Sequence, residues 1–183
     1  AQSARGRGRE PMKTCLITFV VITCLQRLTS ALHLRMGLQV SIKIVGTKKA
    51  GGLKWVSEAY DMYETRCRGQ LELRTEWLKS DNDLVASVVR DRPKLLHVLL
   101  EVQGKSLSSE QFSEQMYKWL EEGGSRVCFV IGGAEGLPAA LQGLGLPSLS
   151  LGPLTLTHQF ARVLLAEQIY RASQIRLGTK YHK

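Results

Sequence analysis

The chain has 183 residues, of which 44% are hydrophobic and 22% charged, and its formal net charge is +9 at pH 7. This length allows one domain, with little chain left for a second. The hydrophobic fraction excludes a wholly disordered chain. The charge is unevenly spread, because residues 1–36 hold six basic residues against one acidic residue. The remaining 147 residues are only mildly basic at +4, which permits an RNA partner without demanding one.

Residues 12–31 have the layout of a secretory signal peptide. A single lysine precedes an apolar run from Cys15 to Leu25, and the small residues Thr29 and Ala31 follow. The run of 11 residues is shorter than the ~20 that a membrane-spanning helix requires, so no stable membrane association is predicted. A buried N-terminal strand or helix is the alternative, but nothing beside the run provides capping or turn chemistry.

Residues 1–36 are therefore assigned to a leader, and residues 37–183 to the folded domain. If cleavage follows Ala31, the stub before the first strand is short, basic and free of acidic residues. A signal peptide followed by a basic stub resembles the two-part leaders of algae whose plastids lie inside the endomembrane system. The expected location is the plastid, whereas a start at Met36 would leave the protein in the cytosol.

Strands and helices alternate along the folded part. Val40, Ile42 and Ile44 alternate with polar residues, which predicts a half-buried strand within 38–48. A helix, a strand, a short helix and a buried strand are expected next, over 53–68, 71–78, 82–91 and 95–102.

Two of the predicted helices carry an apolar stripe at helical spacing. The stripe of the helix within 53–68 consists of Trp55, Ala59 and Met62. The stripe of the helix within 108–124 consists of Phe112, Met116, Trp119 and Leu120. The second helix also begins with Ser108 and Gln111 at the spacing of a capping box, and a glycine pair ends it.

The last elements are a buried strand over 126–131, a short strand and loop within 146–158, and a long helix over 158–176. Alternating strands and helices predict an α/β fold with a mostly parallel sheet. Apolar residues surround most of the long helix, so one chain is not expected to cover it all. This favours a dimer interface, and deep burial within one subunit is the alternative.

Cys67 and Cys128 are the cysteines of the folded part, and they lie far apart in the sequence. Neither belongs to a CxxC pair or lies near a pair of histidines. We interpret them as core or surface thiols rather than as a disulfide framework or a zinc site, and no metal site is predicted.

A glycine loop, Gly-Gly-Ala-Glu-Gly, occupies residues 132–136 after a predicted strand. It is neither GxGxxG nor GxxxxGK(S/T), and the dinucleotide fingerprint belongs after the first strand rather than the fourth. On the motif alone, the glycines simply make the turn. The location favours a ligand, because ligands of open α/β sheets bind outside the carboxyl ends of strands. Two further strand ends, 100–104 and 150–155, flank this loop in sequence, and a glycine pair lets backbone groups approach adenine or ribose.

Four segments carry a resemblance to a known family. They are LEVQGKSLSSEQF, FVIGGAEGLP, SLGPLTLTHQFARVLLAEQIYRA and the closing YHK. Together they resemble the RlmH (YbeA-like) family of SPOUT methyltransferases over residues 38–183, in order and with natural spacing. The resemblance implies a methyltransferase for N3 of a pseudouridine in 23S-type ribosomal RNA. It also implies a C-terminal trefoil knot in the α/β fold, a homodimer, and S-adenosylmethionine as the methyl donor.

The resemblance further implies which residues bind the donor. They are Leu100, Gly133, Gly152, Pro153, Leu154, Thr155, Leu156 and Thr157. The glycine loop would then contact an adenosyl group through backbone groups. It needs no lysine for this ligand, since the donor lacks the phosphates that a P-loop binds.

Four residues are candidates for the chemistry, namely His158, Arg162, Tyr181 and His182. The closing Tyr-His of the family implies a tail that reaches the target base, and histidine suits proton removal near neutral pH. A solvated, inert terminal histidine is the alternative. Arg162 would be a fixed positive charge for RNA phosphate or for a developing anion, or else part of a surface or dimer salt bridge. His158 opens the long helix beside the donor loop, where backbone groups could equally satisfy it.

The chain departs from the pattern of the family at two positions. The stretch around Asp81 is shorter and more acidic than the basic segment of many members, and Thr157 stands where proline is common. A catalytically silent RNA- or ribosome-binding module on the same fold is therefore the rival function. The donor loop and the Tyr-His tail favour the enzyme, because a pure binder would need neither. The expected partners are ribosomal RNA, in the large ribosomal subunit or the ribosome, and a second copy of the chain.

Overall fold

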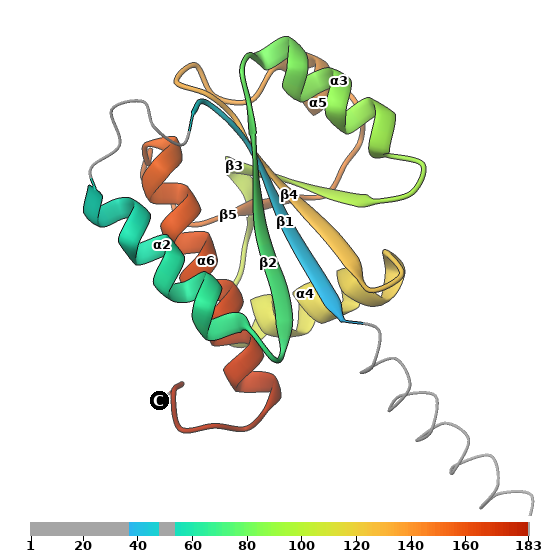
Figure 1. The fold of residues 1–183 in the computed structure, drawn as a ribbon. Coiled ribbons are helices and arrows are strands. Elements are labelled where there is room, and N and C mark those ends of the chain that lie inside the picture. The colour runs from blue at the N-terminus through green and yellow to red at the C-terminus, as the bar shows by residue number, and fades with distance from the viewer. Residues whose placement is uncertain (1–36, 48–53, 183) are drawn as a thin grey trace, which may run out of the picture. The chain divides into compact units, whose positions relative to one another are not determined.

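The computed structural model describes residues 37–47 and 54–182 (Figure 1). The predicted leader, residues 1–36, lies outside the described residues, as do residues 48–53 and Lys183. Among the helices that the structure describes, none is long and apolar enough to cross a membrane.

Five strands of the described chain form one sheet. They are β1 (Leu38–Val45), β2 (Leu71–Leu78), β3 (Leu96–Ser106), β4 (Arg126–Ile131) and β5 (Ser148–Ser150). Their order is β2-β1-β4-β3-β5, and every neighbouring pair is parallel. The predicted α/β fold with a mostly parallel sheet is confirmed. Because the strands are parallel, the carboxyl ends of β1, β2 and β4 lie at one edge, the upper edge of the sheet in Figure 1, and β3 turns away towards α4 after its middle.

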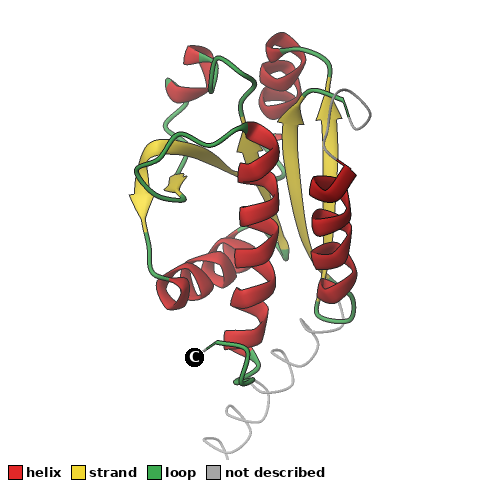
Figure 2. Ribbon diagram, turned by 90° about the vertical axis from the view of Figure 1, so that its left-hand side faces the viewer, coloured by secondary structure: helices red, strands yellow, loops and turns green. Residues whose placement is uncertain are grey.

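Helices cover both faces of the sheet. On one face lie α2 (Lys54–Cys67), α4 (Ser109–Glu122) and α6 (His158–Arg176), and on the other lie α3 (Asp81–Asp91) and α5 (Ala139–Gln142). In Figure 2, α6 runs down the front of the sheet beside α2. Ile42 and Leu165 are fully buried in the larger core, on the side of α2, α4 and α6. Leu84 is fully buried in the smaller core, on the side of α3 and α5. Each such side chain contributes roughly 1.5–3 kcal/mol by its burial.

The prediction for α4 is confirmed in detail. Its capping box is present, with Gln111 N donating to Ser108 Oγ at 3.2 Å and Ser108 N donating to Gln111 Oε1 at 3.0 Å. The predicted stripe is buried, and it consists of Phe112, Met116, Trp119 and Leu120. The strand over 126–131 and the helix over 158–176 also have their predicted bounds.

The predicted apolar face of α2 is wrong. Trp55 and Met62 are 49% and 38% exposed, whereas Val56 and Tyr60 are buried. Trp55 packs edge-on against Phe160 of α6 instead, with 5.4 Å between ring centroids. Two adjacent stripes of this helix are both apolar, so periodicity alone could not decide which one faces the sheet.

Strand β3 extends beyond its predicted end at residue 102 and pairs with β5 twice. Leu149 lies opposite Leu100 and again opposite Lys105, so β3 bulges between these two residues. A Cβ on Gly104 would lie 2.6 Å from the backbone of Leu149, so this close approach requires glycine. The sequence also gave no sign of α5, because a four-residue helix is too short to show a period.

A lysine is buried on the α3 face of the sheet. Lys43 is 1% exposed, and its Nζ donates to Ser87 Oγ and to Asp91 Oδ2, both at 2.6 Å. His97 and Cys128, fully buried, lie opposite each other where β3 pairs with β4. Removing one partner of a buried ion pair leaves an uncompensated charge and costs about 3–5 kcal/mol, so this cluster fixes α3 to the sheet.

Both cysteines of the described chain, Cys67 and Cys128, are free and buried. This confirms their interpretation as core thiols. Burial raises the pKa of the Cys67 thiol to about 12 and that of Cys128 to about 11. Neither side chain is therefore a thiolate nucleophile at neutral pH.

Candidate functional site

A cavity of about 330 Å³ lies at the carboxyl edge of the sheet. Its walls come from the ends of β3 and β4, the glycine loop after β4, the loop between β5 and α6, and the first turn of α6. Six of the eight residues predicted to bind the donor line it, namely Leu100, Gly133, Gly152, Leu154, Thr155 and Leu156. Pro153 and Thr157 are not among the lining residues. The fold therefore gathers strand ends that are up to 50 residues apart in the sequence around one hollow.

The backbone explains two of the three glycines in the loop. A Cβ on Gly132 would lie 2.1 Å from the carbonyl oxygen of Gly136, and Gly136 itself has a φ of +86°. Gly136 N donates to Gly133 O at 3.2 Å and closes the turn. At Gly133, by contrast, a Cβ would only touch Asp81 Oδ1 at 3.4 Å and Val45 Cγ1 at 3.5 Å. The turn thus requires glycine at 132 and 136 but not at 133, which lines the cavity.

The loop between β5 and α6 is fixed at both ends by local hydrogen bonds. Gly152, whose φ is +129°, donates from its N–H to Ser150 Oγ at 3.2 Å, and that hydroxyl donates to Gly152 O at 3.0 Å. Thr157 is the N-cap of α6, since its Oγ1 accepts from Phe160 N at 3.4 Å. Threonine at this position therefore anchors the loop to the helix.

The cavity suits a ligand without phosphates. Among the described residues, the charged ones that line it are Glu101 and Glu135, and none is a lysine or arginine. The volume is at the lower end of the ~300–1,000 Å³ found for small-molecule sites. The backbone of the glycine loop offers polar groups to a purine or a ribose, and Leu100 and Leu156 offer apolar walls. An adenosyl group attached to a cationic sulfonium fits this chemistry.

Arg162 is held between two aromatic rings. Its guanidinium carbon lies 4.1 Å from the ring centroid of Tyr60 and 4.8 Å from that of Trp77. The side chain is 4% exposed, makes no salt bridge to a carboxylate of the described residues, and finds no hydrogen-bond partner there for its Nε. Burial lowers the pKa of Arg162, but a guanidinium stays charged at neutral pH. The alternative of a surface salt bridge is therefore not realised within the described chain.

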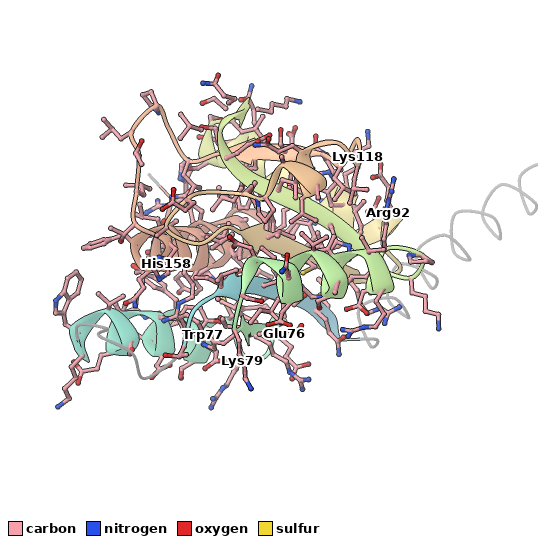
Figure 3. All side chains as sticks on the ribbon, turned by 90° about the horizontal axis from the view of Figure 1, so that it is seen from above. Glu76, Trp77, Lys79, Arg92, Lys118 and His158 are labelled. Carbon is pink, nitrogen blue, oxygen red and sulfur yellow. The ribbon has the colours of Figure 1, made fainter. Side chains whose placement is uncertain are left out.

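His158 lies beside Trp77 at the same carboxyl edge (Figure 3). A Cβ built on Gly46 would lie 3.7 Å from His158 Nε2 and 3.5 Å from Trp77 Cζ3. Gly46 follows β1 with a φ of +135°, and Val45 before it lies close to Gly133 of the cavity. The structure thus brings His158 and Arg162 together around Trp77, and the end of β1 lies near both this cluster and Gly133 of the cavity.

The tail packs against its own chain at the opposite end of α6 (Figure 1). The Tyr181 hydroxyl donates to Glu167 Oε1 at 3.2 Å. His182 Nε2 lies 2.6 Å from Glu110 Oε1, and His182 Nδ1 lies 3.5 Å from Arg171 Nη1. The tail is therefore ordered by side chains of α4 and α6 rather than solvated.

One chain does not bring the tail to the cavity. Ala161 lines the cavity and Arg171 contacts His182. They lie ten positions apart in α6, which corresponds to about 15 Å along the helix. This separation exceeds the length of a nucleobase, so the tail and this cavity lie apart within one chain.

Two residues of these clusters escaped the sequence analysis. Glu110 belongs to the first turn of α4, and nothing in its surroundings links it to a histidine 72 residues later. Trp77 is the second-last residue of β2, an edge strand of the sheet. An aromatic side chain next to the carboxyl end of a strand was the sequence signal that could have indicated a role in the site. Glu167 and Arg171, one turn apart on α6, form an ion pair at 2.6 Å, and Glu167 also accepts from the Tyr181 hydroxyl.

An apolar strip lies on the outer side of α6. Phe160 and Leu164, one turn apart, are 40% and 42% exposed, and Leu154 of the cavity is 75% exposed. Trp55 extends the strip by its contact with Phe160. As predicted from the circumference of this helix, one chain leaves part of it uncovered, and such strips mark interaction sites.

Comparisons with known proteins agree on one family. A family model described as "Predicted SPOUT methyltransferase" matches residues 38–182. Over 146 residues the chain is 38% identical to the ribosomal RNA large subunit methyltransferase H of Protochlamydia amoebophila, covering 80% of this chain and 99% of that protein. The protein of the same name from Chromobacterium violaceum is 33% identical over 161 residues, with 80% and 99% covered. That from Prochlorococcus marinus (strain MIT 9303) is 37% identical over 131 residues, with 70% and 84% covered.

Proposed function

The chain belongs to the SPOUT methyltransferase family, and on that premise we propose that it methylates N3 of a pseudouridine in large-subunit (23S-type) ribosomal RNA. The methyl donor is S-adenosylmethionine. The observation that carries the proposal is the cavity at the carboxyl edge, walled by backbone-rich loops, with no cationic residue among the described ones that line it. Relatives named ribosomal RNA large subunit methyltransferase H, aligned over 99% of their length, support the class of RNA. The acceptor atom rests on the resemblance of the donor loop and the closing Tyr-His.

The chain would bind the donor mainly through its uncharged parts. Backbone groups of Gly133 and Gly152 face the polar edges of the adenosine, and Leu156 packs against it. Glu101 and Glu135 oppose the positive sulfonium. When bound, the donor supplies an electrophilic methyl group on sulfur. The remaining tasks of the protein are to orient the acceptor base and to help remove its proton.

Two side chains are suited to the acceptor. His182 takes the proton of N3, because a neutral imidazole is a competent base near neutral pH. Arg162 supplies a fixed positive charge for the anion that develops on the base. No described carboxylate forms a salt bridge with Arg162 and little water reaches it, so its field is screened less than that of a surface arginine.

The active unit is a homodimer in which the tail of one copy completes the cavity of the other. The distance of about 15 Å along α6 between cavity and tail supports this arrangement. The apolar strip of Phe160, Leu164 and Leu154 lies next to the cavity and would be covered by the second copy. A two-fold dimer then forms two equivalent composite sites.

Two further features belong to the proposal. The family resemblance implies that the C-terminal segment forms a trefoil knot, and the layout of the leader implies that residues 1–36 direct the protein to the plastid, with a cytosolic start at Met36 as the alternative. An experimental structure in which no knot remains when the two ends of the chain are pulled apart would contradict the prediction of a knot. A fluorescent protein fused behind residues 1–36 that stays outside the plastid would contradict the location.

Two measurements test the function. Calorimetry with S-adenosylmethionine should show binding to the purified chain, whereas a silent RNA-binding module would give no heat with the donor. Mass spectrometry of nucleosides from large-subunit rRNA should show that N3-methylpseudouridine disappears when the gene is deleted and returns when it is re-expressed. Persistence of the modified nucleoside in the deleted cells would contradict the proposal.

A further inference from the structure

We propose that Glu110 positions His182 for proton removal, so that the carboxylate and the imidazole act as a dyad in the methyl transfer. The inference rests on the proposed function and assigns a positioning residue to it. Its geometric basis is the 2.6 Å contact between Glu110 Oε1 and His182 Nε2, which joins α4 to the tail.

The carboxylate of Glu110 is itself held in place. Ser108 Oγ donates to its Oε2 at 2.7 Å, which leaves Oε1 for His182. Ser108 is the N-cap of α4 and is fixed in turn by the capping box, and Glu110 lies in the first turn, where a helix favours negative charge. The Ser108 hydroxyl, a backbone N–H and His182 lower the pKa of Glu110 to about 2. Glu110 is therefore ionised throughout the working range of the enzyme.

The contacts of His182 determine which ring nitrogen is free to act as a base. Arginine has only donors, so the nitrogen facing Arg171 Nη1 at 3.5 Å, Nδ1, is the one with the lone pair. Nε2 then carries the hydrogen and donates it to Glu110. The contact of Nδ1 is long for a hydrogen bond, and Arg171 is already bound to Glu167 Oε1 through Nη2 at 2.6 Å. Nδ1 is thus available to an incoming proton, while a carboxylate orients the ring from the other side.

The charged and titratable groups around His182 come from two helices and the tail. Glu110 faces it from α4, Arg171 and Glu167 face it from α6, and Tyr181 precedes it. Glu110 lies closer to the ring than Arg171 does, so the carboxylate stabilises the imidazolium that proton removal produces. In this step N3 gives its proton to Nδ1 and uses the freed electron pair to bond the methyl carbon, whose bond to sulfur breaks with its electrons left on sulfur.

The dyad lies beside an opening. Ser108 and Gln168, both bonded to its network, line a second cavity of about 340 Å³. The wall of this cavity also includes Leu151 and Gly152 of the donor loop. The side chain of His182 retains 26% exposure, so another molecule can approach it.

Three variants test the inference. Glu110→Ala removes both the charge and the hydrogen bond, and Glu110→Gln removes only the charge. Glu114→Gln, exposed one turn further along α4 and without contact to the tail, is the matched control. Methyl transfer to large-subunit rRNA should show kcat reduced about 10- to 100-fold in Glu110→Ala and less in Glu110→Gln, with unchanged donor Kd and RNA KM. The acid limb of the kcat profile should differ from that of the wild type in both, because both lack the charge beside the base.

A role in merely docking the tail gives a different result. Wild-type kcat and acid limb in a folded Glu110→Ala would overturn the dyad. So would a loss confined to KM, or a lower kcat with the acid limb unmoved. Failure of the proposed function would be visible already in the wild type, as an absence of donor binding and of methyl transfer.

Discussion

The two ends of α6 carry two different kinds of site. At the amino end, the cavity is formed by backbone: glycine turns, strand ends and a capped loop, all from one chain. At the carboxyl end, the tail is held by side chains, chiefly Glu110, Glu167 and Arg171, and about 15 Å of helix separates it from that cavity. The first end can bind a ligand within one subunit. The second presents a histidine whose substrate must come from elsewhere.

This contrast indicates how the two ends respond to mutation. A site formed by backbone loses affinity when a Cβ or a larger side chain is added to a glycine that the turn itself does not need. A site formed by a histidine and its partners loses rate when one functional group is removed, and ligand affinity is little affected. Variants at each end should therefore separate donor binding from turnover.

The largest effect is expected at the tail. His182→Ala removes the proposed base, which typically contributes 10²–10⁴-fold in rate, or roughly 3–5 kcal/mol of barrier. Donor affinity measured by calorimetry should be unchanged, because the cavity lies at the other end of α6. Turnover should recover in part at high pH, where N3 loses its proton without help.

The stability of His182→Ala serves as its control. The pair with Glu110 is partly solvated, so urea unfolding should differ from wild type by less than about 1 kcal/mol. A variant that is folded, binds the donor and still turns over at the wild-type rate would show that the tail does not act on the base.

Mixing two impaired variants, at a donor concentration that Gly133→Val binds poorly, tests whether the ends cooperate between subunits. His182→Ala keeps the cavity and Gly133→Val keeps the tail, so a mixed dimer contains one site with both parts intact. Subunit exchange is verified by mass spectrometry of differently tagged copies. In a random mixture half of the dimers are hybrids, and each hybrid has one intact site out of two. Up to about a quarter of wild-type activity should therefore return. No recovery despite exchange would mean that each tail serves its own subunit.

The sequence predicted the amino end of α6 better than the carboxyl end. Strand ends and glycines are local signals that indicate a ligand site at this edge, and six of the eight donor residues that the family resemblance implies line one cavity there. The dyad depends on a contact across 72 residues between a capping segment and a tail, and no local pattern encodes it. The wrong face of α2 has a related cause, because Trp55 packs against Phe160 of a helix formed a hundred residues later.

Loss of activity in acid must be separated from unfolding in acid, and His97 provides the means. Burial first, and then the charge of Lys43, lower the pKa of His97 to about 4. Neither ring nitrogen forms a hydrogen bond with a described group. The backbone of Leu95 nevertheless raises the pKa of His97 and so opposes part of its decrease. Above pH ~6.5 the group is neutral in both states. As the pH falls from about 6.5 to 4 only the unfolded chain takes up the proton, so stability should fall by on the order of 2–3 kcal/mol.

Urea unfolding between pH 7 and pH 4 measures this loss, and His97→Leu should flatten it. Asp91, whose pKa is lowered by Arg90 and then by Lys43, contributes stability that is lost only below pH ~4, outside this window. An equally steep fall in His97→Leu would assign the acid sensitivity to other groups. If His97→Leu loses activity at the same acid pH as the wild type, the loss of activity arises from the tail and not from unfolding.

The smallest change in free energy is expected at Gly133, where it should appear in donor affinity alone. A Cβ at this position already touches Val45 and Asp81 at 3.5 Å and 3.4 Å, so the γ-methyl groups of Gly133→Val must displace the loop that walls the cavity. Calorimetry should show donor affinity lowered at least about tenfold, or ~1.4 kcal/mol. Gly133→Ala, which adds only the tolerated Cβ, should lose less. The fold should persist in both, because this glycine has no positive φ. At saturating donor the turnover of Gly133→Ala should match wild type, since its tail is intact. A folded Gly133→Val with wild-type donor affinity would place the donor elsewhere and remove the distinction between the two ends of α6.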